Sequence, residues 1–490
     1  MTEERFLALA PGPGRRYISA GRAPGLGLVP CALCSPSSVR YHGRGAKACD
    51  RCHRRKKRCR FSYSRWACDG CLRAEEPCGF LVAAEHDRHD ADPDAAWLLP
   101  PATQRPAFLT AGGMRCALAC PTSARDDFIA HFFSPGFAGR MHAVLLACLP
   151  PELDCAAGIC SAMYEAFEAA RGGRMTDSNV EVWLQVMVSA IGLMRHGAAP
   201  GLACFDLLPW IGLGFAIGHL SYVTLGHTAG PVRRFILGHV IERAGAPLLP
   251  AYLCRNPLLL FLVGVDLNEA LLRREMPVCD LEVADGWVPD PCLGLCLPLM
   301  PSLYTLAVLS HRMRDGTPTA ADLETLARLR DKMAGWDLSK VCSDRRLFHG
   351  FTPDEVVHMT TQARVYQLMG QLLTTRVLTS AGCGDPEAAR RTAGGFAAEI
   401  LHLLRQAAEA TSTPLRFVAM PYFAAAVETI GNNERDAVLD VPWGLTGTFM
   451  SQAAAGVSMA LRNLWALEDR LPGRLWLDHV REISPFSLAL

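Results

Sequence analysis

Apolar residues recur at intervals of three and four positions through most of the chain after about residue 126. This spacing places apolar side chains on one face of an α-helix, whereas the alternating pattern typical of strands is nearly absent. The clearest examples are Leu323, Leu326, Leu329 and Met333, then Val356, Met359, Ala363, Tyr366 and Met369, and then Met450, Ala453, Val457, Leu461, Leu464 and Leu467. The pattern predicts a series of amphipathic helices.

Two of these segments follow residues typical of a helix start. Thr352 is followed by a proline and, three positions on, by Glu355, which is the spacing of a capping box. Thr319 and Asp322 repeat that spacing before the first segment. Periodicity and caps together predict one large all-α domain, of one or two lobes, over residues 126–490.

The residues before this domain lack periodicity. Residues 1–46 are rich in Gly, Pro, Ser and Arg, which predicts a disordered segment. Residues 81–125 begin with acids, histidines and prolines, and we interpret them as a solvated linker. No apolar heptad appears there, so the sequence offers no dimerising coiled coil. Cys31 and Cys34 form a lone C-x-x-C pair, which cannot complete a tetrahedral zinc site.

Residues 207–225 could nearly span a bilayer, because none of these nineteen residues is charged. The segment contains a proline, three glycines and His219, and it lacks basic flanks, so we expect a buried helix or helix pair. The glycines, Gly212, Gly214 and Gly218, loosely resemble a dinucleotide-binding loop. Their spacing differs from that motif and no strand precedes them, so helix packing is the favoured interpretation.

Basic residues are concentrated between Arg40 and Arg65. That stretch holds eleven Lys and Arg against one acid, Asp50, a local net charge of +10 in a chain of 490 residues whose formal net charge is +1. The remainder therefore carries a net charge of −9. A basic block on a mildly acidic body is typical of a polyanion-binding module joined to another domain.

Six of the 20 cysteines form a repeat beside this basic block. Each half has the spacing C-x2-C-x6-C, and the second half follows the first by nineteen residues. No secretory signal is visible at the N-terminus, so we expect a reducing compartment, in which clustered cysteines are more often metal ligands than disulfides. The six are Cys49, Cys52, Cys59, Cys68, Cys71 and Cys78.

The number of cysteines limits the metal site that they can build. A C-x-x-C pair can place two sulfurs on one zinc ion at about 2.3 Å each. Six thiolates cannot fill two separate four-coordinate zinc sites, which would need eight ligands. They suffice if two thiolates bridge both metals, and the repeat makes the bridges equivalent members of the two halves. We therefore predict a cluster of two zinc ions per chain over residues 47–80.

The two halves differ in charge. The segment between Cys68 and Cys78 has a net charge of −2, and the segment between Cys49 and Cys59 has a net charge of +5. Only the first half suits phosphates and guanine edges, so we predict that it contacts double-stranded DNA while the second half buttresses it. Its basic residues are Arg51, Arg54, Arg55, Lys56, Lys57 and Arg58.

Residues 48–80 resemble the fungal zinc cluster (Zn₂Cys₆) family of transcription factors, because all six cysteines and the basic run coincide with the family pattern. The resemblance implies two short metal-stapled helices, the first of which enters the DNA major groove, often at CGG triplets. By position, Arg55 and Lys56 would reach bases. The resemblance implies that the thiolates divide into two bridges, Cys49 and Cys68, one pair, Cys52 and Cys59, and a second pair, Cys71 and Cys78.

Two features depart from the family pattern. Residues 60–67 lack the usual proline and carry Phe61, Tyr63 and Trp66 instead, which leaves the loop geometry open. The customary coiled coil is missing, which leaves homodimer formation open. Further along, residues 414–435 and the end near Trp476 are similar to the family's helical regulatory domain.

The resemblance implies a nuclear, sequence-specific regulator of RNA polymerase II transcription, with DNA and transcriptional co-regulators as partners and no membrane. The alternative is a zinc-stapled protein-interaction scaffold that does not read DNA. We expect no enzyme, since G-x-S-x-G, P-loop and HExxH motifs are missing. Glu355 and His358 lie one helical turn apart, as in half of a carboxylate metal site, but a capping or surface role suits them better.

Overall fold

The computed structural model describes the pair of short segments 61–62 and 67–68 and most of the chain from residue 122 onward. Residues 1–46 and residues 81–121 of the predicted linker lie outside the described residues. The described ranges are 61–62, 67–68, 122–148, 154–196, 207–225, 229–253, 256–279, 283, 287–411, 415–439, 451–470, 475–480 and 483.

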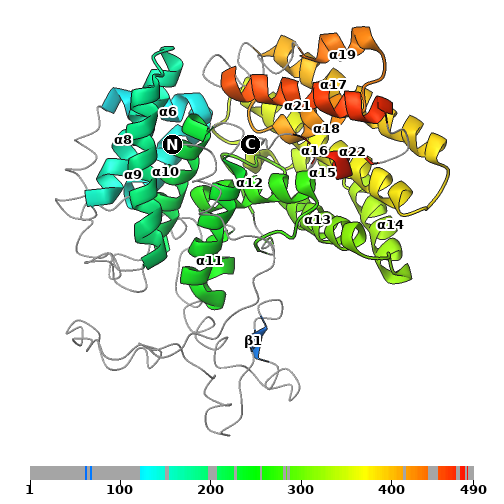
Figure 1. Ribbon diagram of the computed structural model, residues 1–490, viewed down its shortest axis with the longest axis horizontal. Coiled ribbons are helices and arrows are strands. Elements are labelled where there is room, and N and C mark those ends of the chain that lie inside the picture. The colour runs from blue at the N-terminus through cyan, green and yellow to red at the C-terminus, as the bar shows by residue number, and fades with distance from the viewer. Residues whose placement is uncertain are drawn as a thin grey trace, which may run out of the picture. The chain divides into compact units, whose positions relative to one another are not determined.

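From residue 122 onward the described elements are helices, as the periodicity predicts, and the first five form one group. They are α6 (Thr122–Phe132), α7 (Pro135–Cys148), α8 (Asp154–Arg171), α9 (Asp177–His196) and α10 (Leu207–Leu225). α10 packs against α7, α8 and α9, and α6 packs against α7 and α8 (Figure 1). Phe128, Phe167 and Phe215 fill the space between them, and the rings of the first two meet edge to face at 5.5 Å between centroids.

A second group surrounds the long helix α16 (Pro353–Ser380), which packs against its sequence neighbours on both sides. It comprises η4 (Leu297–Leu299), α13 (Met300–Asp315), α14 (Ala320–Ala334), α15 (Leu338–Ser343), η5 (Arg345–Phe348), α17 (Pro386–Ala410), α18 (Ala419–Val427), α19 (Asn432–Leu439), α21 (Ser451–Arg470) and α22 (Trp476–His479).

Two helices connect these groups along the chain, α11 (Gly230–Leu253) and α12 (Pro257–Arg273). α12 contacts α7 and α10 of the first group as well as α13 and α22 of the second. Its side chains are buried from Pro257 through Leu272, so α12 forms the centre of the helical unit. Asn256 starts the helix, because its Oδ1 accepts hydrogen bonds from the amides of Leu258 and Leu259.

Both predicted capping boxes are confirmed. Thr352 and Glu355 begin α16 with reciprocal side-chain-to-backbone hydrogen bonds, and Thr319 and Asp322 do the same for α14. The predicted apolar faces are also the buried ones in these helices. The buried positions are Leu326, Leu329, Met333, Met359, Ala363, Tyr366 and Met369, and in α21 they are Val457, Leu461 and Leu464.

The uncharged segment 207–225 is a single buried helix, α10. Within the described part of the chain, Leu208–Leu225 alone is long and apolar enough to cross a membrane, and 83% of that window is buried inside the protein. Core helices of soluble proteins pass the same test of length and composition. The segment packs on four other helices, so its apolar character is used in protein contacts.

Candidate zinc centre

Two short strands lie between the two halves of the cysteine repeat. β1 (Phe61–Ser62) pairs antiparallel with β2 (Ala67–Cys68), with Phe61 opposite Cys68 and Ser62 opposite Ala67. Paired Cα atoms in such a ladder are about 4.5–5.5 Å apart. The pairing therefore holds the backbone of Cys68, the first cysteine of the second half, beside a residue only two positions beyond Cys59.

This proximity fits a metal centre shared by the two halves. A thiolate that bridges two zinc ions must lie near ligands of both halves, and the ladder places the backbone of Cys68 beside Phe61, two positions beyond Cys59 in sequence. Strand pairing also fixes the distance between the backbones of Phe61 and Cys68. The donor set of six thiolates itself suits zinc, which accepts sulfur ligands in tetrahedral geometry.

Apart from Cys68, the predicted ligands and DNA contacts lie outside the described residues. The ligands concerned are Cys49, Cys52, Cys59, Cys71 and Cys78. The predicted DNA contacts concerned are Arg51, Arg54, Arg55, Lys56, Lys57 and Arg58.

The part of the chain described after residue 122 holds cysteines of a different kind. Within the described ranges, no group of three or more His, Cys, Asp or Glu side chains is placed to bind a metal ion. Cys292 and Cys296 are free thiols with no more than 1% of their surface exposed. Burial raises the pKa of both thiols well above the ordinary value, so they stay protonated and unreactive.

Glu355 and His358 are positioned for structural roles. Glu355 Oε2 accepts from the backbone amide of Thr352 at 2.7 Å, and Oε1 accepts from the amide of Gly136 in the first turn of α7 at 2.6 Å. One carboxylate therefore serves two helix starts, α7 and α16. His358 Nε2 lies 2.7 Å from the Thr411 hydroxyl. The predicted capping role of Glu355 is confirmed.

The glycines of α10 are packing residues, as the sequence favoured. A Cβ atom on Gly212 would lie 2.1 Å from the backbone oxygen of Cys148 in α7. A Cβ atom on Gly214 would lie 2.8 Å from a methyl carbon of Ile236 in α11. Both glycines lie within a helix and not in a strand-to-helix loop, so they do not form a dinucleotide-binding turn.

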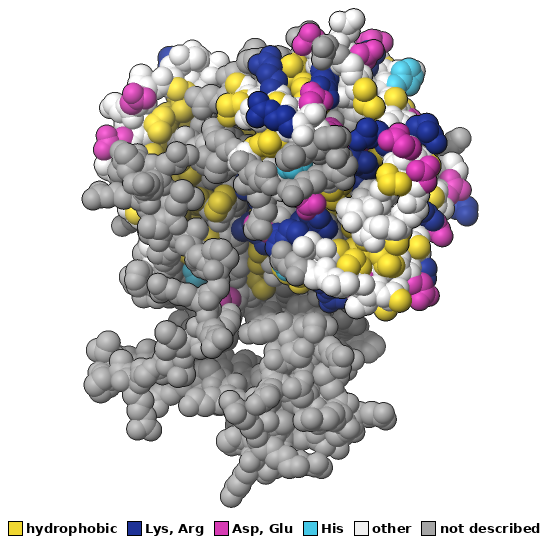
Figure 2. All heavy atoms as spheres, turned by 45° about the vertical axis from the view of Figure 1, so that its right-hand side comes forward, with side chains coloured by type: hydrophobic (Ala, Val, Ile, Leu, Met, Phe, Trp, Pro, Cys, Tyr) yellow, Lys and Arg dark blue, Asp and Glu magenta, His cyan; other side chains and the backbone are white. Residues whose placement is uncertain are grey.

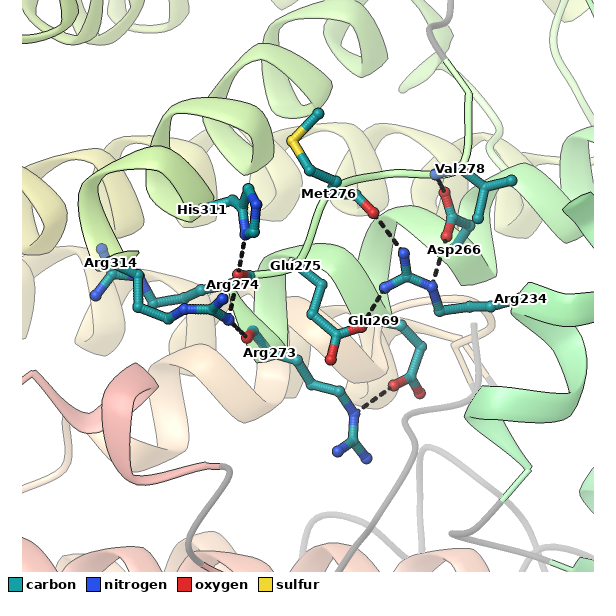
Figure 3. A network of polar contacts seen from close by, with 10 residues as sticks. All are labelled: Arg234, Asp266, Glu269, Arg273, Arg274, Glu275, Met276, Val278, His311 and Arg314. Atoms are coloured by element: carbon teal, nitrogen blue, oxygen red, sulfur yellow. Dashed lines mark hydrogen bonds and ion pairs between the residues drawn. The ribbon is translucent and has the colours of Figure 1, made fainter. Parts of the chain in front are cut away.

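A polar network that the sequence pattern did not predict ties α11 to the end of α12 (Figure 3). Arg234 lies 3.3 Å through Nε from Asp266 Oδ1, and its Nη1 donates to Glu275 Oε2 at 2.6 Å. Its Nη2 donates to the Met276 carbonyl. Asp266 also accepts from the Val278 amide at 2.8 Å, and burial raises its pKa to about 6. Each charge here has a partner within the protein.

Arg274 forms a second cluster directly after α12, next to Glu275 of the first network. It adopts a left-handed conformation with φ 51° at the C-terminal end of α12, and its side chain is buried. Its guanidinium donates to the Ser310 hydroxyl at 3.0 Å and to Asp478 Oδ1 at 2.5 Å. Its carbonyl accepts from Arg314 at 2.7 Å (Figure 3). These contacts join α12, α13 and α22. The contacting residues are separated by up to 204 positions in sequence, so no local motif could have indicated these contacts.

Acidic and basic side chains lie interspersed on the face of the helical unit in Figure 2, with apolar side chains between them. A nucleic-acid-binding surface is normally dominated by positive charge. The concentration of basic residues in this chain is instead the one between Arg40 and Arg65.

Comparison of the chain with known protein families, with curated proteins and with solved structures finds no match in any of the three.

Proposed function

We propose that this protein is a zinc-dependent, sequence-specific DNA-binding regulator of RNA polymerase II transcription that acts in the nucleus. One observation carries the proposal: two halves of identical cysteine spacing differ in charge, +5 in the first and −2 in the second. Metal binding requires the cysteines of both halves, whereas only DNA binding gives a reason to load one half with six cations.

In the proposed mechanism, the six cysteines of residues 47–80 would hold two zinc ions, because this segment is too short to build a hydrophobic core of its own. The bound metal would crosslink the chain and supply no reaction. Arg55 and Lys56 reach base edges in a CGG-like half-site, and Arg51, Arg54, Lys57 and Arg58 contact mainly phosphates. The antiparallel pairing of Phe61 with Cys68 supports this arrangement because it joins the two halves at their boundary.

The helical unit from residue 122 onward is proposed as an effector domain that meets transcriptional co-regulators. Its all-α architecture supports this role only in general terms, since an architecture hosts many functions. No metal-binding group occurs among the described residues of the helical unit. We assign the proposed zinc binding to the cysteine repeat.

The decisive experiment is binding-site selection from random duplex DNA with the full-length protein and zinc. We expect enrichment of a G-rich triplet, and we expect Cys49→Ala to abolish it. Cys342→Ala is the matched control, because Cys342 is a free, partly exposed cysteine of α15 far from the repeat in sequence. A protein that retains zinc but enriches no sequence would instead be the zinc-stapled interaction scaffold.

A further inference from the structure

Arg233, in the first turn of α11, is a buried cation with unused hydrogen-bond donors. Only 2% of its surface is exposed. Among the residues that the structure describes, no acceptor lies within hydrogen-bonding distance of its Nε or Nη1. A guanidinium stays charged inside a protein, and a buried charge without hydrogen-bond partners is strongly unfavourable. The arrangement therefore calls for an acceptor that the described residues do not supply.

Tyr222 of α10 forms one wall beside this guanidinium. The Arg233 Cζ atom lies 4.7 Å from the centre of the Tyr222 ring, within the range of a cation–π contact. The Tyr222 hydroxyl is also buried, and it has no hydrogen-bond partner in the described part of the chain. Burial raises the pKa of Tyr222, so the hydroxyl keeps its proton and can donate. Two unused donor groups thus lie on neighbouring helices.

The charges around Arg233 leave an excess of positive charge. Glu269 of α12 lies against Gly230, since a Cβ atom on that glycine would come within 2.8 Å of its carboxylate oxygens. Glu269 Oε2 also accepts from Arg273 Nε at 2.8 Å (Figure 3). The Glu269 charge also attracts the Arg233 guanidinium. One carboxylate is thus shared by two guanidiniums, and the N-terminal end of α11 adds partial positive charge. The neighbouring Arg234, in contrast, is balanced by two acids of its own.

We infer that Arg233 and Tyr222 form a binding site for a small oxyanion between α10, α11 and α12. The ligand group would be a carboxylate or a phosphate, because either accepts several hydrogen bonds from a planar guanidinium. The guanidinium and the Tyr222 hydroxyl would donate to its oxygens. With 2% of Arg233 and 6% of Tyr222 exposed, a polymer such as DNA cannot reach the two donors. This site is independent of the proposed zinc cluster.

The test is thermal unfolding of the full-length zinc-loaded protein in sodium acetate, sodium phosphate or sodium chloride at equal ionic strength. We expect acetate or phosphate to raise Tm above the effect of chloride, with the logarithm of its concentration once that exceeds Kd and by roughly 3 °C at one hundred times Kd. The anion whose rise in Tm begins at the lower concentration identifies the ligand group as a carboxylate or a phosphate. Calorimetric titration with the same anion should give one site per chain.

Variants separate this site from general salt effects. Arg233→Gln should remove the rise in Tm above chloride, and Tyr222→Phe should raise Kd at least several-fold while keeping the ring. Arg312→Gln is the control, because Arg312 is 62% exposed and should leave the response unchanged. If Arg233→Gln does not fold, the Tyr222→Phe comparison still decides the matter. The inference is wrong if neither oxyanion shows saturable binding in the calorimetric titration, or if Tyr222→Phe binds as tightly as the unmodified chain.

Discussion

Gly212 gives the sharpest test of the helical packing, because adding one methyl group there should push two helices apart. In the present structure an alanine Cβ would lie 2.1 Å from the carbonyl oxygen of Cys148 and 2.6 Å from its carbonyl carbon. Real Cβ atoms essentially never approach closer than 3.0 Å, so α10 and α7 would have to separate by about 0.9 Å. The obstacle is backbone, which cannot rotate away as a side chain can.

Two opposing terms set the size of the effect. Replacing a helical glycine by alanine stabilises the helix by about 1 kcal/mol. Overpacking of a buried contact typically costs 1–3 kcal/mol, and a backbone contact should lie near the upper end, at about 3 kcal/mol. We therefore expect Gly212→Ala to lower the free energy of unfolding by about 2 kcal/mol, or roughly 3 °C in Tm.

Matched substitutions isolate the steric term. Gly395 in α17 has nothing within 4 Å of its added Cβ, so Gly395→Ala should stabilise the protein by up to about 1 kcal/mol. Gly214→Ala should fall between the two, because its obstacle is a methyl group of Ile236 that can move. The assay is denaturant-induced unfolding followed by circular dichroism. A Gly212→Ala protein as stable as Gly395→Ala would refute the packing argument for α10.

Three further predictions follow from the cysteine repeat and from the carboxylate between α7 and α16. Metal analysis of the full-length protein should find two zinc ions per chain. Cys49→Ala should lose both zinc ions, and Cys78→Ala should lose mainly one. If each variant lost one zinc ion, the assignment of the bridging cysteines would be wrong. In competition titrations, Lys56→Ala should reduce the preference for a G-rich triplet by about 1–3 kcal/mol at one base pair. Arg58→Ala should lower the affinity for all DNA sequences alike and reduce the salt slope by about one. If both variants lost affinity equally on every sequence, this segment would be an electrostatic anchor only. Burial opposes ionisation of Glu355, but hydrogen bonds from Ser134, Thr352 and Gly136 outweigh it and lower its pKa, so its contribution is present above about pH 4.3 and lost as the pH falls through the lowered pKa. Glu355→Gln should therefore lower the free energy of unfolding by roughly 1–3 kcal/mol at pH 7 and by much less near pH 3; an equal loss at both pH values in denaturant titrations would contradict this role.

The helical architecture was predictable because its signals are local. A capping box needs only Thr352 and Glu355, three positions apart, and a buried face needs only apolar residues such as Met359 and Tyr366 at helical spacing. The length of α10 could be read in the same way, because uncharged residues run from one end of that helix to the other.

The tertiary contacts were not predictable because their partners are distant in the chain. Glu355 was expected to cap its own helix, but nothing in the sequence indicated that it also binds the amide of Gly136, 219 positions away. The same holds for Arg274 and Asp478. At the candidate zinc centre the six ligands and the two-zinc stoichiometry stay predictions from the cysteine spacing, while the pairing of Phe61 with Cys68 depends on strand register that no local pattern specifies.

The charge asymmetry of the cysteine repeat separates the proposed function from its rival. The two halves repeat the same cysteine spacing because both would bind metal. A scaffold that uses zinc only to fold would gain nothing from a difference in net charge between the halves. DNA breaks that symmetry, because one face of the module meets phosphates and the other meets solvent or protein. The surrounding chain sharpens the contrast: outside Arg40 to Arg65 the sequence is net acidic, and an acidic body favours nucleic-acid contacts through the basic segment alone. Orientation on DNA would then be set by residues 49–59, and the helical unit would be left free for partners other than DNA.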